Sequence, residues 1–285
     1  MKVFVKPTGM YSRAMVRIAD ALARHAPPSV SITADRDAAD LVVLYVIGPD
    51  ALQAGRDLVA AGKKYAAVQC CWKTTGVADA DWMPFWRDAD LVWSYYQLPG
   101  DGTFNFYYAP LGVDTIFASA YRLSNVKQPT IITTGFVSSP AGEAIEEVWL
   151  AARRCNFRTI HIGPPNVEGT LLHADEHIQP SDAKLAAVYA EARWVASLRH
   201  TEGFECPAAE AVVAGTRPLL FDQPTLLYWY RDVAEYVPEC SGDVLVDLLT
   251  IKLSGLDPVS GHERDWLLRR FDWATICRGF WERVL

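Results

Sequence analysis

Three glutamates within a short stretch of the second half of the chain could hold a polyhydroxylated ligand. Glu202 and Glu210 are separated by seven residues, and Glu205 lies between them. Carboxylates accept paired hydrogen bonds, which suits the vicinal hydroxyls of a sugar or a ribose. The alternative is that Glu202 and Glu205 are solvated loop charges and that Glu210 is a surface helix residue. The elements around them distinguish these interpretations.

The sequence predicts a strand, a loop, a helix and a second strand around these glutamates. Residues 194–196 and 219–221 are short apolar runs of the kind that buried parallel strands use. Pro207 suits a first helical turn, and Gly215 is a stop signal. The glutamates are therefore expected at the carboxyl end of a parallel strand, where open α/β sheets bind ligands.

A helix start at this position adds a second preference, for phosphate. The first N–H groups of a helix lack internal partners, and the helix dipole places a partial positive charge there. A polyol joined to a phosphate is the chemistry of a nucleotide sugar. The pattern therefore predicts a nucleotide-sugar site.

The same stretch resembles the Glu-x7-Glu motif of retaining glycosyltransferases with the GT-B fold, in particular glycosyltransferase family four. The resemblance rests on Glu202-Gly203-Phe204, Glu210-Ala211 and Ala214-Gly215-Thr216. Further segments are similar to the family in the same order, namely residues 108–114, 185–192 and Phe271-Asp272-Trp273. The resemblance covers most of the chain, and it is strongest from Ser181 to Pro224.

The resemblance implies an α/β GT-B fold, in which two Rossmann-like domains face a cleft and a C-terminal helix crosses back to the first domain. We expect an acceptor domain at 1–123, a nucleotide-sugar donor domain at 124–262 and a final helix at 263–285. Apolar strands alternating with amphipathic helices agree with this architecture. We place the linker at 121–129, which is polar and ends in proline.

The family also implies roles for individual residues. Glu202 is the expected catalytic residue, and the remaining assignments fall into three groups. The donor sugar is assigned to Glu202, Gly203, Phe204, Glu205 and Cys206, the ribose to Glu210, and the diphosphate to Gly9, Gly135, Ser138, Ser139 and Arg199. The expected reaction moves a sugar from a UDP- or GDP-sugar to an acceptor hydroxyl with retention of configuration, with no metal and no other cofactor.

The chain departs from the family where the donor diphosphate is bound. The family has an arginine just after the glycine that matches Gly135, and a lysine a few residues later. This chain has Phe136 there, and Ala141 or Gly142 near the lysine position. Charge stabilisation of the leaving group is usually the largest catalytic term, so Ser138, Ser139 and Arg199 are the expected substitutes. The alternative is a glycosyltransferase-like binding protein with weak or no turnover.

Composition limits the other classes of function. Of the 285 residues, 51% are hydrophobic and 21% charged, as in globular proteins, and the formal net charge is -7. That charge argues against nucleic-acid binding, although a glycosyltransferase of modified DNA bases, such as a viral one, remains a third alternative. We expect no signal peptide and no membrane insertion. Six cysteines without a C-x-x-C pair indicate the cytoplasm. We interpret His173 to His177 as a loop and not a metal site.

Overall fold

The computed structural model describes residues 1–7, 13–121, 127–135, 143–163, 173–201, 203–255 and 259–285. The chain divides into two compact units, each built on a six-stranded parallel sheet. The first unit comprises Met1–Gly112 and Phe271–Leu285, and the second comprises Val113–Arg270. These bounds differ from the expected 1–123, 124–262 and 263–285.

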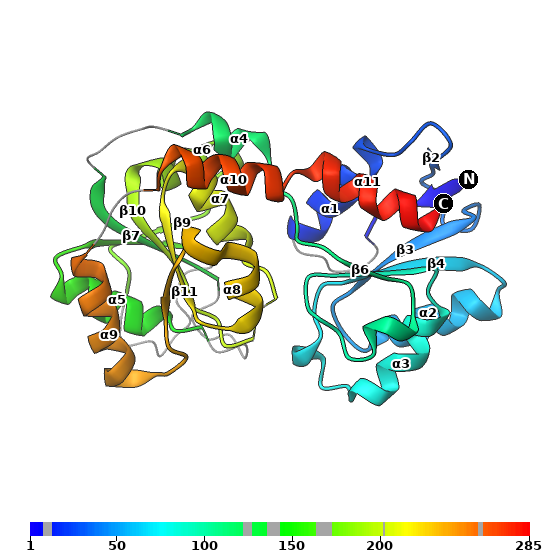
Figure 1. The fold of residues 1–285 in the computed structure, drawn as a ribbon, viewed down its shortest axis with the longest axis horizontal. Coiled ribbons are helices and arrows are strands. Elements are labelled where there is room, and N and C mark those ends of the chain that lie inside the picture. The colour runs from blue at the N-terminus through cyan, green and yellow to red at the C-terminus, as the bar shows by residue number, and fades with distance from the viewer. Residues whose placement is uncertain (8–12, 122–126, 136–142, 164–172, 202, 256–258) are drawn as a thin grey trace. The chain divides into compact units, whose positions relative to one another are not determined.

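The first unit has the strand order β2-β1-β3-β4-β5-β6 (Figure 1). Its strands are β1 Lys2–Phe4, β2 Ser31–Ile32, β3 Leu41–Val46, β4 Lys64–Gln69, β5 Leu91–Ser94 and β6 Phe106–Tyr108. Its helices are α1 Arg13–Arg24, α2 Asp50–Ala60, α3 Asp79–Asp88 and α11 Trp273–Val284. α1 packs against α11, and α2 packs against α3. The run Leu-Val-Val-Leu-Tyr-Val forms β3 because β-branched and other apolar residues suit a strand covered on both faces.

The second unit has the strand order β12-β11-β10-β7-β8-β9. Its strands are β7 Gln128–Thr134, β8 Arg158–Ile162, β9 Glu176–Ile178, β10 Ala192–Ser197, β11 Arg217–Phe221 and β12 Glu235–Val237. Its helices are α4 Thr115–Ser119, α5 Ile145–Arg154, α6 Asp182–Glu191, α7 Cys206–Ala214, α8 Pro224–Tyr230, α9 Gly242–Ser254 and α10 Gly261–Arg270. Short 3-10 turns complete the two units at Lys73–Thr75, Asp101–Thr103 and Arg231–Val233.

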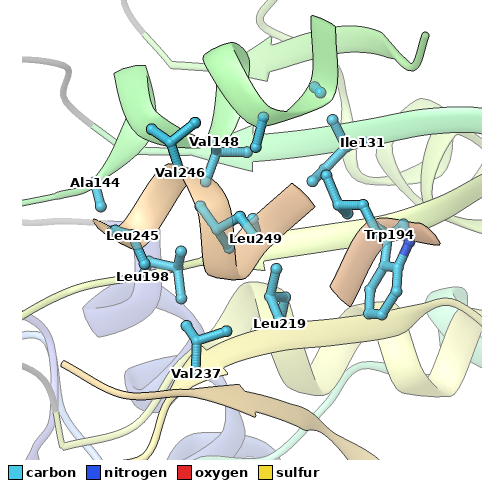
Figure 2. Close-up of a cluster of buried hydrophobic side chains, with 14 of the residues drawn as sticks. Ile131, Ala144, Val148, Trp194, Leu198, Leu219, Val237, Leu245, Val246 and Leu249 are labelled. Carbon is cyan, nitrogen blue, oxygen red and sulfur yellow. The ribbon is translucent and has the colours of Figure 1, made fainter. Parts of the chain in front are cut away.

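The core of the second unit lies between its sheet and the helix pair α5 and α9 (Figure 2). Trp194 and Leu219, from the neighbouring strands β10 and β11, share this core with Val148 of α5 and Leu249 of α9, and each of these four side chains is buried. Every second residue of a strand faces the same side, so Trp194, Ala196 and Leu198 all enter this core. The rigid layer holds the carboxyl ends of the strands in fixed positions.

The strand-loop-helix-strand unit around the glutamates forms as predicted. Pro207 lies in the first turn of α7, and the helix ends at Gly215, whose φ is +92°. The N–H of Thr216 donates to the carbonyl of Ala211 at 2.8 Å, which closes the helix in the manner of a glycine C-cap. α7 thus connects the carboxyl end of β10 to the start of β11.

Two expectations about local structure need correction. The final segment is two helices instead of one, because the carboxylate of Asp272 caps a new helix start by accepting the N–H of Thr275 at 2.9 Å. Only α11 belongs to the first unit, whereas α10 packs against α7 in the second. The segment expected as a loop around His177 contains β9, in which His177 pairs with His161 of β8.

Candidate functional site

The carboxyl edge of the second sheet brings several sequence-predicted residues together. Since all its strands are parallel, the segments that follow β7, β10 and β11 leave the sheet at the same edge. Gly135 follows β7, and Arg199 follows β10. Gln223 follows β11 and donates from its side-chain amide to the carbonyl of Arg199 at 2.8 Å. The segments that follow β10 and β11 are therefore joined by a hydrogen bond at this edge of the sheet.

Glu210 lies inside α7 and is only 5% exposed. Its neighbours in the helix are buried alanines and valines. Burying a carboxylate is unfavourable unless polar or charged groups compensate it, so Glu210 is not an ordinary solvated charge. The alternative that Glu210 is a surface residue is wrong.

Glu205 forms the N-cap of α7 and is completely buried. Its backbone carbonyl accepts hydrogen bonds from the hydroxyl of Tyr230 at 2.5 Å and from the N–H of Ala209 at 3.1 Å. The ring of Phe204 stacks on Tyr230 with 5.7 Å between ring centroids. The entry to α7 is thus fixed by side chains of α8, and Glu205 is not the solvated loop charge of the alternative interpretation.

Arg199 lies between two buried carboxylates. Its Nε is 3.2 Å from Oε1 of Glu143, and its Nη1 is 3.4 Å from Oε2 of Glu205. The Arg199 side chain is 20% exposed, while those of Glu143 and Glu205 are 6% and 0% exposed. A candidate cation for the diphosphate is therefore present at the edge, and it is held by two anions.

Gly135 lies in close contact with Glu143. Its φ is +116°, and a Cβ atom at this position would meet Oε2 of Glu143 at 1.9 Å. Its N–H donates to the carbonyl of Ile162 at 3.2 Å, which ties it to β8. Both the backbone conformation and the close approach require glycine here.

A buried polar cluster supports the backbone next to Gly135. The hydroxyl of Thr133 accepts a hydrogen bond from the indole N–H of Trp149 at 3.1 Å and lies 3.0 Å from Nδ1 of His161. His161 is fully buried, and its ring packs edge-on against Trp149 and His177. Burial, together with the neighbouring His177, lowers the pKa of His161 to about 4. His161 is therefore neutral at physiological pH.

The predicted site residues fall into two groups. The structure brings Gly135, Arg199, Phe204, Glu205 and Glu210 into the second unit, together with Gly203 and Cys206. The others, Gly9, Ser138, Ser139 and Glu202, lie outside the described residues, as do Phe136, Ala141 and Gly142.

Sequence reasoning missed Glu143 and His161. Glu143 stands just before two further acids, Glu146 and Glu147, that favour an ordinary helix start. Only its pairing with Arg199, in an antiparallel bridge, sets it apart from them. His161 lies within an apolar strand, and the pairing of β8 with β9 that places it beside His177 was not predicted.

The first unit contains a cavity of about 380 Å³ beside the ends of β1 and β3. Its lining includes Phe4, Pro7, Met15, Tyr45 and Asp50. β2 and β3 lie on opposite sides of β1, so the strand order reverses here, and open α/β sheets bind ligands at such a point.

Among the described residues, no group of three or more histidine, cysteine, aspartate or glutamate side chains is arranged to hold a metal ion. None of the helices in the described part of the chain is long and apolar enough to cross a membrane.

No protein-family model matches the chain. The sequence also has no match among curated proteins.

Solved structures do match, along almost the whole chain. AviGT4, a glycosyltransferase involved in avilamycin A biosynthesis, has a TM-score of 0.65 at 15% identity, covering 99% of this chain and 96% of that one. Anabaena HepE in complex with UDP-glucose has a TM-score of 0.68 at 13% identity, covering 99% and 98%. The UDP-forming trehalose-phosphate synthase of Burkholderia xenovorans has a TM-score of 0.63 at 15% identity, covering 97% and 79%. The two parallel sheets and these likenesses together show that the chain has the GT-B glycosyltransferase fold.

Proposed function

We propose that the chain is a retaining glycosyltransferase that moves a sugar from a nucleotide-sugar donor to an acceptor hydroxyl without a metal ion. The observation that carries the proposal is the buried Glu210 in a helix that starts at the carboxyl edge of a parallel sheet. Several structures with this fold contain UDP or UDP-glucose, including Anabaena HepE. Family four is the specific relationship that the motif residues suggest.

In this proposal the second unit binds the donor. Glu210 accepts hydrogen bonds from the ribose hydroxyls, because a buried carboxylate can take both at once. Glu202, with the segment from Gly203 to Cys206, holds the donor sugar at the start of α7. Within this unit the diphosphate is assigned to Gly135, Arg199 and the start of α7, together with Ser138 and Ser139, while the part expected of Gly9 stays a prediction from the sequence.

The chemistry requires neutralisation of the leaving diphosphate. We assign this task to Arg199, which contacts Glu143 beside Gly135 and whose guanidinium can donate to several oxygens at once. The leaving phosphate is proposed to take the proton of the acceptor hydroxyl, as in the family that the motif resembles, so no side chain is assigned as general base. The first unit, with its cavity beside β1 and β3, is proposed to bind the acceptor.

Donor hydrolysis tests this proposal before any acceptor is known. The protein is incubated in chelator with UDP-glucose, UDP-N-acetylglucosamine or GDP-mannose, and released nucleoside diphosphate is measured by chromatography. We expect slow release from one donor class, lost in Glu202→Gln and retained in Glu191→Gln, which changes an exposed acid of α6. NMR of the released sugar should show first the anomer that has the same anomeric configuration as the donor. Release that is equal in both variants, or inverted sugar, would contradict the proposal.

A further inference from the structure

We propose that Glu143 is a specificity-determining residue of the donor site, whose carboxylate competes with the donor diphosphate for Arg199. This inference rests on the proposed function, because it concerns how the same edge of the sheet accepts a charged donor. It assigns to Glu143 a role that the sequence motif does not contain. Three features of the structure support it.

The first feature is that the backbone fixes Glu143 beside Arg199. The two residues form an antiparallel bridge, and the N–H of Ala144 donates to the carbonyl of Leu198 at 3.0 Å. Ala144 and Leu198 are both buried at the border of the core in Figure 2. The contact between Glu143 Oε1 and Arg199 Nε, at 3.2 Å, is therefore anchored at both ends and is not a chance surface pair.

The second feature is the space that Glu143 occupies. Glycine at the end of a strand allows a ligand to approach the backbone closely. At Gly135 that space is filled by the Glu143 carboxylate, because a Cβ atom would meet its Oε2 at 1.9 Å. An anion entering beside Gly135 thus encounters a carboxylate, and the two negative charges repel each other.

The third feature is the balance of charge. Among the described residues, Arg199 contacts the two carboxylates of Glu143 and Glu205, and these three groups by themselves carry a formal charge of −1. Glu143 contacts Nε of the guanidinium, while Glu205 contacts Nη1. Since a guanidinium has five N–H donors, Arg199 can exchange Glu143 for a phosphate oxygen while it keeps Glu205. The exchange makes donor binding depend on the charge of Glu143.

The test compares ligands that share a base and differ in charge. Dissociation constants of UDP, UMP and uridine are measured by calorimetry for the wild type, Glu143→Gln and the control Glu147→Gln. Glu147 lies in the first turn of α5, and its carboxylate accepts the N–H of Gly242 at 3.3 Å. We expect Glu143→Gln to bind UDP about tenfold tighter, UMP less so and uridine unchanged, because the removed repulsion acts on phosphate charge.

Other outcomes distinguish a failure of this inference from a failure of the proposed function. UDP binding that is unchanged or weaker in Glu143→Gln, or a gain that is equal for uridine, would overturn the role of Glu143 alone. Absence of nucleotide binding to every form of the protein would overturn the proposed function as well. If Glu143→Gln does not melt cooperatively, Glu143→Ala is used because it removes the same charge. Its gain in affinity must then be largest for UDP, smaller for UMP and absent for uridine. Glu143→Asp keeps the charge and should show no gain for UDP.

Discussion

The hydroxyl of Tyr230, at the end of α8, donates a hydrogen bond of 2.5 Å to the backbone carbonyl of Glu205 at the start of α7. Both residues are completely buried, and Phe204 stacks on the Tyr230 ring. One aromatic side chain therefore fixes the segment that we assign to the donor sugar. The position of this segment depends on packing as well as on the helix start.

Removing that hydroxyl should weaken folding. Tyr230→Phe keeps the stacking on Phe204 and deletes the hydrogen bond, and the Glu205 carbonyl still accepts from Ala209. We expect the free energy of unfolding to fall by about 1 kcal/mol, measured with urea. Tyr228→Phe is the control, because Tyr228 is 46% exposed. Equal stabilities of the two variants would contradict a role for the Tyr230 hydroxyl.

Gly135→Ala should be more damaging than an alanine at another glycine with positive φ. Both Gly135 and Gly242 have positive φ, but only Gly135 has an atom close to the added Cβ, whereas Gly242 has none within 4 Å. The backbone strain alone costs about 1 to 2 kcal/mol. We expect Gly242→Ala to lose that amount in urea unfolding and Gly135→Ala to lose clearly more. A similar loss in both would show that Glu143 moves aside without cost.

The stability of the second unit should depend on pH through His161. Its pKa is lowered to about 4 in the folded protein, compared with about 6.5 for an ordinary histidine. The unfolded chain therefore binds the proton first as the pH falls. This contribution to stability is complete above pH 6.5 and is lost progressively between pH 6.5 and 4.

Unfolding at two pH values measures this contribution. Between pH 7 and pH 5 the difference attributable to His161 is on the order of 2 kcal/mol. His161→Asn keeps a polar atom near Thr133 and removes the titration, so its stability should fall less over the same interval. If wild type and variant lose the same free energy of unfolding, His161 is not the titrating group.

The local pattern predicted the central strand-loop-helix-strand unit well. Pro207 and Gly215 bound α7 as expected, because a proline in the first turn and a glycine at positive φ each have a specific backbone consequence. Alternating apolar strands and amphipathic helices predicted parallel α/β sheets, because few other arrangements bury both faces of such strands. The more specific GT-B arrangement was an expectation from the family resemblance of the motif residues.

Long-range partners were less accessible to sequence reasoning. Arg199 was expected to replace the missing cations, but its pairing with Glu143 depends on how the segment before α5 meets the end of β10. No local propensity encodes that contact. Likewise, the break between α10 and α11 occurs at a single cap, Asp272, whose carboxylate accepts the N–H of Thr275.

The most direct test of the central claim is thermal melting with nucleotides and nucleotide sugars, in chelator, for the wild type, Glu210→Gln and the control Glu191→Gln. A ligand at a hundred times its dissociation constant stabilises the native state by about 2.7 kcal/mol, which shifts the melting temperature measurably. We predict a shift for one nucleotide class that persists in Glu191→Gln and is lost in Glu210→Gln. A cooperative melt that no nucleotide or donor displaces, or a shift that Glu210→Gln retains in full, would contradict the assignment of this site.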